Sequence, residues 1–298
     1  MTSTVTQANR EAARRSLQGL ALGDAFGERW FPLLRDPARA LDEIRARRTP
    51  EEPDWRWTDD TALALAVHQT LSRCGEIDQD RLADAFARTY EDDPARGYGR
   101  GMRLLLPRLL AEPGSWRTLA PRLFDGGSFG NGAAMRVAPL GAWFSADLDR
   151  AAAQAELSAR VTHAHPEGVA GAVAVAVAAA LSARHALSVD AVADRTPLGT
   201  VHDGLRRAAA LPLTTPPHRA AALLGNGRHT RADDTVPFAV WTAARHPHDL
   251  EAALWSTAEA LGDTDTTCAI TGGIVSSATG VDSVPPAWLA RREALPEW

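Results

Sequence analysis

Apolar residues recur every three or four positions through most of the chain, and this spacing predicts helices. Several of these stretches begin with a short polar residue, or with Asp followed by Pro, which are typical helix starts. Strict alternation rich in β-branched residues, which indicates strands, is scarce. The expected helices lie in residues 10–26, 36–48, 58–74, 78–93, 96–112, 147–165, 188–196 and 248–261. We therefore predict an all-α fold with about ten or more helices.

The chain offers no clear linker between domains. Its segments rich in Pro, Gly and polar residues, which we expect to be loops, lie at 47–57, 113–134, 210–236 and 280–287. None of them is long and biased enough to separate two units, and no repeat of about 20–50 residues is evident. A length of 298 residues suits one large domain or two small ones. We predict one compact domain over residues 1–298.

Composition changes this picture mainly by exclusion. A net charge of −5 gives no electrostatic reason for binding nucleic acid or a membrane surface. All 32 residues counted as lysine or arginine are arginine, which excludes a lysine nucleophile or Schiff base. The most apolar run, residues 168–183, is shorter than the ~20 residues of a membrane span. Its alanine content and its charged flanks indicate a buried helix.

The cysteines and the N-terminus bear on the compartment. Cys74 and Cys268 lie far apart and lack CxxC spacing, which favours reduced, buried thiols over a disulfide or zinc site. Residues 1–15 contain no apolar core of a signal sequence. We expect a cytoplasmic protein without membrane attachment, present as a monomer.

Two adjacent carboxylates precede the expected helix at 58–74. The sequence Thr58-Asp59-Asp60-Thr61 suits a helix N-terminus, where a capping residue and first-turn acids are favourable by a fraction of a kcal/mol to about 1 kcal/mol. Taken alone, the motif is more typical of a cap than of a metal site. A cap needs one such residue, however, and this stretch has four.

A second stretch of the same kind lies 200 residues downstream, at Asp263-Thr264-Asp265-Thr266. Oxygen ligands without His or Cys suit hard cations such as Mg²⁺ or Mn²⁺. The small residues that follow, among them Gly272 and Gly273, would let this segment pack closely against a neighbour. Two acidic helix starts that meet could hold two metal ions about 3.5–4 Å apart. Together, the two motifs favour a metal site over two caps.

The sequence "ADDT" at 232–235 resembles the motif at 58–61, but different residues follow it. The following Pro237 lies just inside a possible helix, so we expect a cap or first turn there and no metal.

Two further motifs could contact a phosphorylated ligand. In "GGSFGNGAAMR" (126–136) closely spaced Gly and Asn permit positive φ, so that backbone N–H groups can point together at phosphate oxygens, although such a loop is more often only a loop. Phe129 could stack on a base or pack into the core. In "THAHPEG" (162–168) His163 could hydrogen-bond a ribose or phosphate, or could be structural. His165 is the more structural of the two.

Taken in order, these motifs resemble the ADP-ribosylglycohydrolase family, which includes the dinitrogenase-reductase-activating glycohydrolase and ADP-ribosyl-arginine and ADP-ribosyl-serine hydrolases. The matching fragments are 19–27, 57–66, 96–101, 127–141, 162–168, 234–241 and 261–280. Any one fragment is weak, but the ordered set is highly specific. The resemblance implies an all-α orthogonal multi-helix bundle. It also implies cleavage of the glycosidic bond at the distal ribose of ADP-ribose.

The resemblance also assigns roles by position. The implied ligands of two Mg²⁺ or Mn²⁺ ions are Thr58, Asp59, Asp60, Asp263, Asp265 and Thr266. The implied substrate-binding residues are Ser128, Phe129, Gly130, Asn131, His163 and Tyr98. Within this frame, Asp60 or Asp265 could take the proton of a metal-bound water. The expected partner is ADP-ribose or an ADP-ribosylated substrate, with nucleic acid only as a modified substrate.

The chain departs from the family near its N-terminus. Family members often carry a glutamate four residues after the final glycine of "GDAxG", where this chain has Phe31, whereas Glu28 directly follows Gly27. Either Glu28 takes the catalytic role or the carboxylate comes from elsewhere. An ADP-ribose-binding protein with little catalysis, and a hydrolase of another ribosyl bond in a nucleotide or nucleic-acid adduct, are the alternatives.

Overall fold

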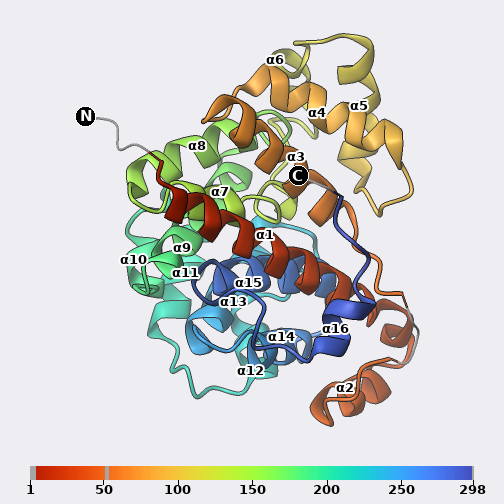
Figure 1. The fold of residues 1–298 in the computed structure, drawn as a ribbon, viewed down its shortest axis with the longest axis vertical. Coiled ribbons are helices and arrows are strands. Elements are labelled where there is room, and N and C mark those ends of the chain that lie inside the picture. The colour runs from red at the N-terminus through yellow and green to blue at the C-terminus, as the bar shows by residue number, and fades with distance from the viewer. Residues whose placement is uncertain (1–4, 51–53, 297–298) are drawn as a thin grey trace.

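The computed structural model describes residues 5–50 and 54–296, a part of the chain with sixteen α-helices, three short 3-10 helices and no strand (Figure 1). The first helices are α1 (Gln7–Glu28), α2 (Pro37–Arg45), α3 (Asp59–Cys74), α4 (Gln79–Asp92), α5 (Arg100–Ala111), α6 (Trp116–Leu119), α7 (Ala138–Trp143) and α8 (Leu148–Arg160). The others are α9 (Pro166–Ala183), α10 (Val189–Ala193), α11 (Thr200–Ala210), α12 (Pro217–Leu224), α13 (Ala232–Arg245), α14 (Leu250–Ala258), α15 (Thr264–Thr279) and α16 (Pro286–Arg291). The 3-10 helices are η1 (Phe31–Arg35), η2 (Ala120–Arg122) and η3 (Asn131–Ala133).

The all-α prediction is confirmed, and every segment expected to be helical contains a helix. Three of the expected loops are partly helical. Segment 113–134 contains α6, η2 and η3, segment 210–236 contains α12, and segment 280–287 contains the start of α16. Helices α12 and α16 begin with a proline at the first helical position, where its fixed φ is favourable and its missing N–H costs nothing. Pro217 and Pro286 are therefore helix starts and not loop residues.

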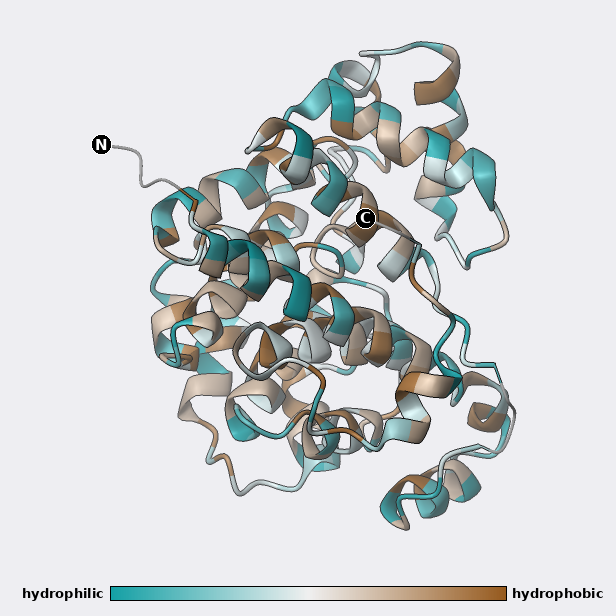
Figure 2. Cartoon of the chain, in the orientation of Figure 1, coloured by the Kyte–Doolittle hydropathy of each residue, from teal (hydrophilic) through white to brown (hydrophobic). Residues whose placement is uncertain are grey.

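The apolar run predicted to be a buried helix is α9. By length and composition α9 could cross a membrane, yet 83% of its 18 residues are buried inside the protein. Its alanines and valines face α7, α8, α13 and α15 on all sides. Outer helices such as α4 instead carry both hydrophilic and hydrophobic residues, as helices that bury one face do (Figure 2). α9 is therefore a central core helix.

A stripe of glycines brings α1 onto the backbone of α15, and the two helices run side by side through the middle of the molecule (Figure 1). Gly19, Gly23 and Gly27 recur at four-residue spacing, which places them on one face of α1. A Cβ atom on Gly23 would collide with the carbonyl oxygen of Cys268, and one on Gly27 would collide with that of Thr264. Only glycine permits this approach, which was expected from the small residues of α15.

The close packing of α1 and α15 decides where the acids of α1 lie. Asp24 and Glu28 each follow a glycine of the stripe directly, so both are held near the first turn of α15. The first turn of α3 lies against the same part of α1, because Asp24 hydrogen-bonds Thr58 and Thr61. Three helix segments far apart in the sequence thus meet around one group of carboxylates.

Candidate active site

A cavity of about 440 Å³, which we call the large cavity, opens between the starts of α3 and α15. Opposite these helix starts lie the segment 128–132, the side chain of His163 and the loop 229–231. The predicted site residues in its lining are Asp59, Asp60, Ser128, Phe129, Gly130, Asn131, His163, Asp263, Asp265 and Thr266. The fold therefore brings together most of the residues that the sequence singled out.

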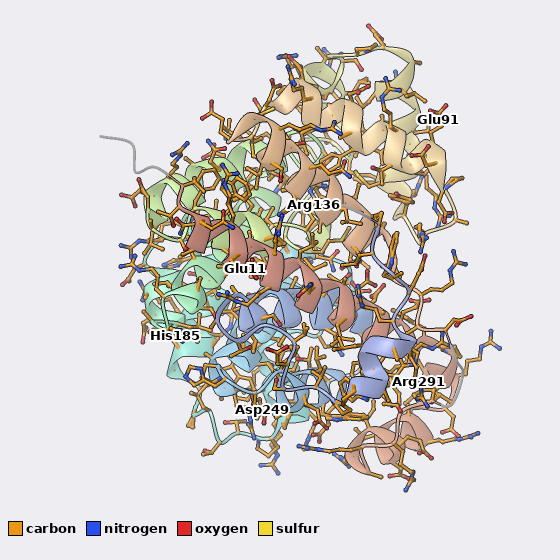
Figure 3. The ribbon with its side chains drawn as sticks, in the orientation of Figure 1. Glu11, Glu91, Arg136, His185, Asp249 and Arg291 are labelled. Carbon is orange, nitrogen blue, oxygen red and sulfur yellow. The ribbon has the colours of Figure 1, made fainter. Side chains whose placement is uncertain are left out.

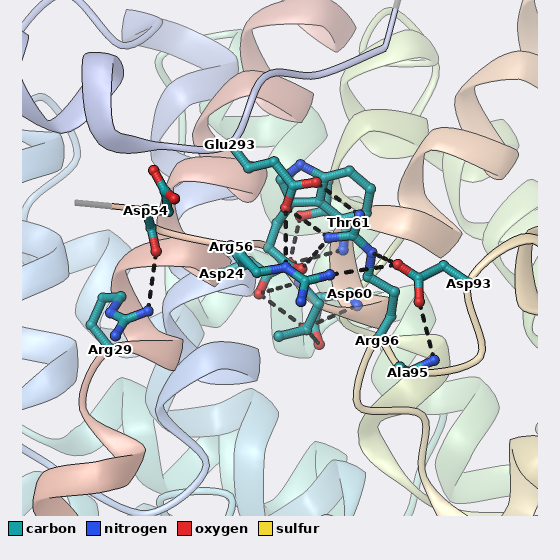
Figure 4. A network of polar contacts seen from close by, with 12 residues as sticks. Asp24, Arg29, Asp54, Arg56, Asp60, Thr61, Asp93, Ala95, Arg96 and Glu293 are labelled. Atoms are coloured by element: carbon teal, nitrogen blue, oxygen red, sulfur yellow. Dashed lines mark hydrogen bonds and ion pairs between the residues drawn. The ribbon is translucent and has the colours of Figure 1, made fainter. Parts of the chain in front are cut away.

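Asp24 holds the start of α3 in place. Its fully buried carboxylate accepts the Thr58 backbone N–H at 2.9 Å and the Thr58 hydroxyl at 2.9 Å. It also accepts the backbone N–H of Thr61 at 3.1 Å and the hydroxyl of that residue. Figure 4 shows Asp24, Asp60 and Thr61 within this network. Asp24 thus satisfies donors that would otherwise be orphaned at a buried helix N-terminus.

Arg96 clamps the same segment from the other side. Its backbone oxygen accepts the Asp59 N–H at 2.7 Å, and its guanidinium donates to the carbonyl oxygen of Trp57 at 2.9 Å. The guanidinium lies 3.6 Å from the centre of the Trp57 ring and forms two hydrogen bonds with Glu293, at 2.7 and 2.8 Å (Figure 4). Charge pairing and stacking together fix the approach to α3.

The start of α15 is tied to the glycine-rich segment. Asn131 Nδ2 donates to Asp263 Oδ2 at 2.7 Å and to the hydroxyl of Thr235 at 3.1 Å. Asp265 Oδ1 accepts the N–H of Thr266 at 2.7 Å. Asp263 is the residue before α15, yet its side chain does not cap the helix. A capping role therefore does not explain the carboxylate of Asp263.

Burial and mutual repulsion raise the pKa values of these carboxyl groups. Burial raises the pKa of Asp24 to about 6, against the hydrogen bonds that lower it. Burial, then the charge of Asp24, raises the pKa of Asp59 to about 7. The pKa values of Asp60 and Asp265 lie well above the ordinary range, because burial and neighbouring carboxylates both oppose ionisation. These shifts describe a cluster whose negative charges repel one another.

The donor set fits a hard divalent cation. It is built from carboxylate and hydroxyl oxygens, and Oδ1 of Asp60 is buried without a hydrogen-bond partner among the described residues. Within the same described ranges, no three Asp, Glu, His or Cys side chains form a preformed ligand group.

The glycine-rich segment adopts the expected left-handed backbone at its first two glycines, but not at Gly130 or Asn131. Positive φ occurs at four consecutive residues, Phe124, Asp125, Gly126 and Gly127, ahead of Ser128. Gly130 has a φ of −61°, and η3 begins at Asn131. The strained turn carries the chain into the cavity wall, where Ser128 and Asn131 are buried. It is the sharp turn before Ser128, rather than Gly130 or Asn131, that uses the glycine conformation.

Phe129 and His163 line the cavity, whereas His165 caps a helix. Phe129 is half-buried and lines the cavity, with the Arg231 guanidinium 5.1 Å from its ring centre. His163 is buried, lines the cavity, and has its Nδ1 2.8 Å from the hydroxyl of Thr162. His165 precedes α9 and accepts the N–H of Glu167 at 3.1 Å. His165 is therefore the structural histidine, as predicted.

Glu28 lines a second, neighbouring cavity of about 380 Å³, which we call the side cavity. Thr58, Arg56 and Phe31 also line it. Asp263 and Asp265 line both cavities, so these carboxylates form the wall between them. Burial, then the charge of Asp24, raises the pKa of Glu28. Glu28 thus reaches the carboxylate group from the side opposite the glycine-rich segment.

Tyr98 lies away from the cavity, contrary to its predicted place among the substrate-binding residues. Its side chain is fully buried and packs edge-on against Tyr90, with ring centres 4.9 Å apart. The neighbouring Gly97 and Gly99 line the cavity instead. The fragment 96–101 therefore contributes backbone to the site, while its aromatic side chain belongs to the core.

The "ADDT" letters at 232–235 form the first turn of α13, as expected. Asp234 accepts the His229 N–H at 2.9 Å, and Asp233 pairs with Arg231. The residues that sequence reasoning missed are Asp24 and Arg96, which hold the start of α3. The only signal for Asp24 was its place after a glycine in the fragment 19–27, and Arg96 carried none beyond the fragment 96–101.

Comparison with known proteins agrees with this geometry. The sequence profile of the ADP-ribosylglycohydrolase family matches residues 5–298. ADP-ribosylhydrolase ARH3 of Danio rerio is 30% identical over 95% of this chain and 87% of its own, and the Homo sapiens protein is 31% identical over 81% and 76%. ADP-ribosylarginine hydrolase Tri1 of Serratia proteamaculans is 24% identical over 94% of this chain and 74% of its own.

A solved structure, titled "ADP-ribosylglycohydrolase-related protein complex", superposes with a TM-score of 0.63 at 26% identity. The match covers 97% of this chain and 94% of that one. The family profile, the relatives and the fold all point to hydrolysis of an ADP-ribose linkage. This chain belongs to the ADP-ribosylglycohydrolase family.

Proposed function

We propose that this protein hydrolyses the glycosidic bond between ADP-ribose and an acceptor, in a reaction that depends on Mg²⁺ or Mn²⁺. The observation that carries the proposal is one cavity in which the carboxylates of α3 and α15 face the 128–131 segment and His163. An acidic cluster suits a sugar whose anomeric carbon gains positive charge during bond cleavage. The Ser128 hydroxyl and the Arg231 guanidinium line the same cavity, and both can donate hydrogen bonds to a diphosphate.

The residues that would hold two ions are Thr58, Asp59, Asp60, Asp263, Asp265 and Thr266. When bound, such ions would supply positive charge that neutralises the carboxylates, orients ribose hydroxyls and lowers the pKa of a water. The hydrogen bond from the Thr58 hydroxyl to Asp24 supports this assignment, because it leaves the Thr58 oxygen as an electron-pair donor.

The other residues bind and orient the substrate. Ser128 and Asn131 border the cavity where the diphosphate would lie, and Phe129 offers an aromatic face to a base. Arg231 lines the cavity beside Phe129 and is held there by its ion pair with Asp233. Oδ1 of Asp60 would accept a proton from an attacking water, a role supported by its lack of a hydrogen-bond partner among the described residues.

We assign Glu28 to the part of the site that would hold the acceptor. It lies in the side cavity, across the wall formed by Asp263 and Asp265 from the nucleotide loop. A carboxyl group with a raised pKa can hold the proton that a departing acceptor needs. We infer that ADP-ribose occupies the large cavity while the acceptor extends into the side cavity.

Release of free ADP-ribose tests the proposal. Serine-, arginine- and phosphate-linked ADP-ribosyl substrates are incubated with the protein and the products are measured by mass spectrometry. Turnover that is lost with EDTA and restored by Mg²⁺ or Mn²⁺ supports it. ADP-ribose binding without turnover on any substrate would instead support a binding protein. Turnover only on nucleotide or nucleic-acid adducts would instead support a hydrolase of another ribosyl bond.

Matched variants separate a site effect from a stability effect. Asp59→Asn and Asp265→Asn each remove one carboxylate, and we expect losses of about 100-fold or more, since a bound ion supplies several kcal/mol to the transition state. Asp249→Asn changes a helix-start aspartate far from the cavity, which accepts the Ala252 N–H at 2.9 Å, and should retain full turnover. Full activity of Asp59→Asn in the presence of Mg²⁺ would refute the metal assignment.

A further inference from the structure

A fully buried arginine lies behind the cavity wall. Figure 3 labels Arg136 among the helices of the interior, and its side chain is 0% exposed. Its Nη2 donates to the backbone oxygen of Ser158 at 3.0 Å and to the hydroxyl of Thr162 at 2.9 Å. The guanidinium also lies 4.2 Å from the centre of the Phe86 ring. Ser158 is in the last turn of α8, where backbone oxygens carry partial negative charge that favours a cation.

Thr162 links Arg136 to His163 through its hydroxyl group. A threonine hydroxyl has one proton to donate, and arginine offers no acceptor. Because the Thr162 oxygen accepts a hydrogen bond from Arg136, its own hydrogen is available to another acceptor, and Nδ1 of His163 lies 2.8 Å away. When Nδ1 is the unprotonated nitrogen of the ring, it accepts this hydrogen, and both the Arg136 and the Thr162 donors are then satisfied.

His163 is neutral at physiological pH, so its tautomer decides what it offers to a ligand. Burial, helped by the charge of Arg136, lowers the pKa of His163 to about 3. In a neutral imidazole with Nδ1 unprotonated, Nε2 carries the hydrogen. Nε2 lies toward the glycine-rich wall, since a Cβ atom on Gly132 would lie 2.9 Å from it and one on Gly130 would lie 3.5 Å from it.

We propose that Arg136 and Thr162 are positioning residues that fix His163 as the Nε2–H tautomer, so that it donates a hydrogen bond to an anionic phosphate oxygen in the cavity. A phosphate oxygen at neutral pH only accepts hydrogen bonds. The other tautomer would direct a lone pair at it and repel it. The inference rests on the proposed function for the identity of the anion, which is the diphosphate of ADP-ribose.

The tautomer can be read directly in the ligand-free protein. Long-range ¹H–¹⁵N correlation spectra distinguish protonated from unprotonated imidazole nitrogens, and the His163 signals among the nine histidines are identified by their loss in His163→Gln. We expect an unprotonated Nδ1 and a protonated Nε2 in the natural protein. A protonated Nδ1 there would overturn the inference without any variant.

Variants of Thr162 test the relay. Thr162→Val keeps the shape but loses the hydroxyl, and we expect the Nδ1–H tautomer to become populated and the ADP-ribose Kd to rise about 10-fold. Thr162→Ser should restore both properties. Thr196→Val is the matched control, because it removes a buried hydroxyl that donates to the Val192 oxygen, and it should change neither. An unchanged tautomer or an unchanged Kd in Thr162→Val would overturn the proposal.

Failure of the proposed function looks different. If the natural protein does not bind ADP-ribose at all, the proposed function is refuted, and the ligand identity in this inference is refuted with it. The imidazole signals of the ligand-free protein still decide whether Arg136 and Thr162 set the tautomer of His163.

Discussion

The carboxylate of Asp24 accepts hydrogen bonds from both the backbone N–H and the hydroxyl of Thr58. Asp24 lies on α1 and Thr58 precedes α3, so this pair connects the glycine stripe of α1 to the carboxylate cluster. Asp24 itself lines neither cavity. Its importance comes from the residues that it orients.

Replacement of Asp24 by Asn should weaken metal binding. The amide would present two N–H groups where four donors need acceptors, so the start of α3 would shift. We expect the affinity for Mn²⁺ or Mg²⁺, measured by calorimetry, to fall about 10- to 100-fold, as for other residues that orient metal ligands. Asp249→Asn serves as the control. An unchanged affinity would show that Asp24 does not position the ligands.

Replacement of Glu28 by Gln should slow turnover and leave nucleotide binding intact. Glu28 lies in the side cavity, away from the segment expected to bind the diphosphate, so the ADP-ribose Kd should not change. Loss of a positioned general acid typically lowers kcat about 100-fold or more. Glu11→Gln, an exposed acid on the same helix, is the control. A normal kcat in Glu28→Gln would transfer the catalytic role to Asp60 or Asp265.

Replacement of Gly23 by Ala should separate α1 from α15. The added methyl group would collide with the backbone of Cys268, which cannot swing aside as a side chain can. Overpacking of this kind costs about 1–3 kcal/mol, measurable as a lower free energy of unfolding in urea. Gly99→Ala, whose Cβ would meet no atom within 4 Å, is the stability control. Equal stability of the two variants would contradict the glycine-stripe packing.

Replacement of Tyr98 by Phe should leave the ADP-ribose Kd and kcat unchanged. The Tyr98 hydroxyl is buried and has no hydrogen-bond partner among the described residues, so its removal exposes nothing and frees no acceptor. We expect stability to be equal or higher by up to about 1 kcal/mol. A Kd that rises severalfold would reinstate Tyr98 as a substrate-binding residue.

His68 should make the protein sensitive to acid. Burial lowers the pKa of His68 to about 4, so folding favours the neutral ring. Its contribution to stability is therefore complete above the unfolded pKa of about 6.5 and is lost as the pH falls toward 4. We expect His68→Gln to flatten the fall in Tm over this range. His248→Gln, which changes an exposed histidine, should retain the slope of the natural protein.

The sequence predicted the helices well, because apolar spacing reports which face of each segment is buried. Its loops were less reliable, because Pro217 and Pro286 can mark either a turn or the first residue of a helix. α1 extends through Gly19 and Gly23 despite their poor helix propensity. Packing against α15 overrides that propensity, and packing is not visible in a local window.

The carboxylate motifs of the site could be predicted because their chemistry is unusual in itself. Four oxygen-bearing residues at Thr58–Thr61 and four more at 263–266 exceed what helix caps need. Asp24 could not be found in this way, since one aspartate inside an apolar helix carries no local signal. Its role depends on the distance between α1 and α3. Tyr98 was misplaced because its flanking glycines, and not its ring, face the cavity.

The wall shared by the two cavities has a consequence for inhibitor chemistry. Because Asp263 and Asp265 separate the large cavity from the side cavity, a nucleotide analogue and an acceptor analogue would occupy different compartments. If the proposed function holds, a compound confined to the side cavity would exclude the acceptor and would leave the binding of free ADP-ribose to the large cavity unchanged. A short linker past Gly97, which lines both compartments, would join two weak binders into one bivalent ligand.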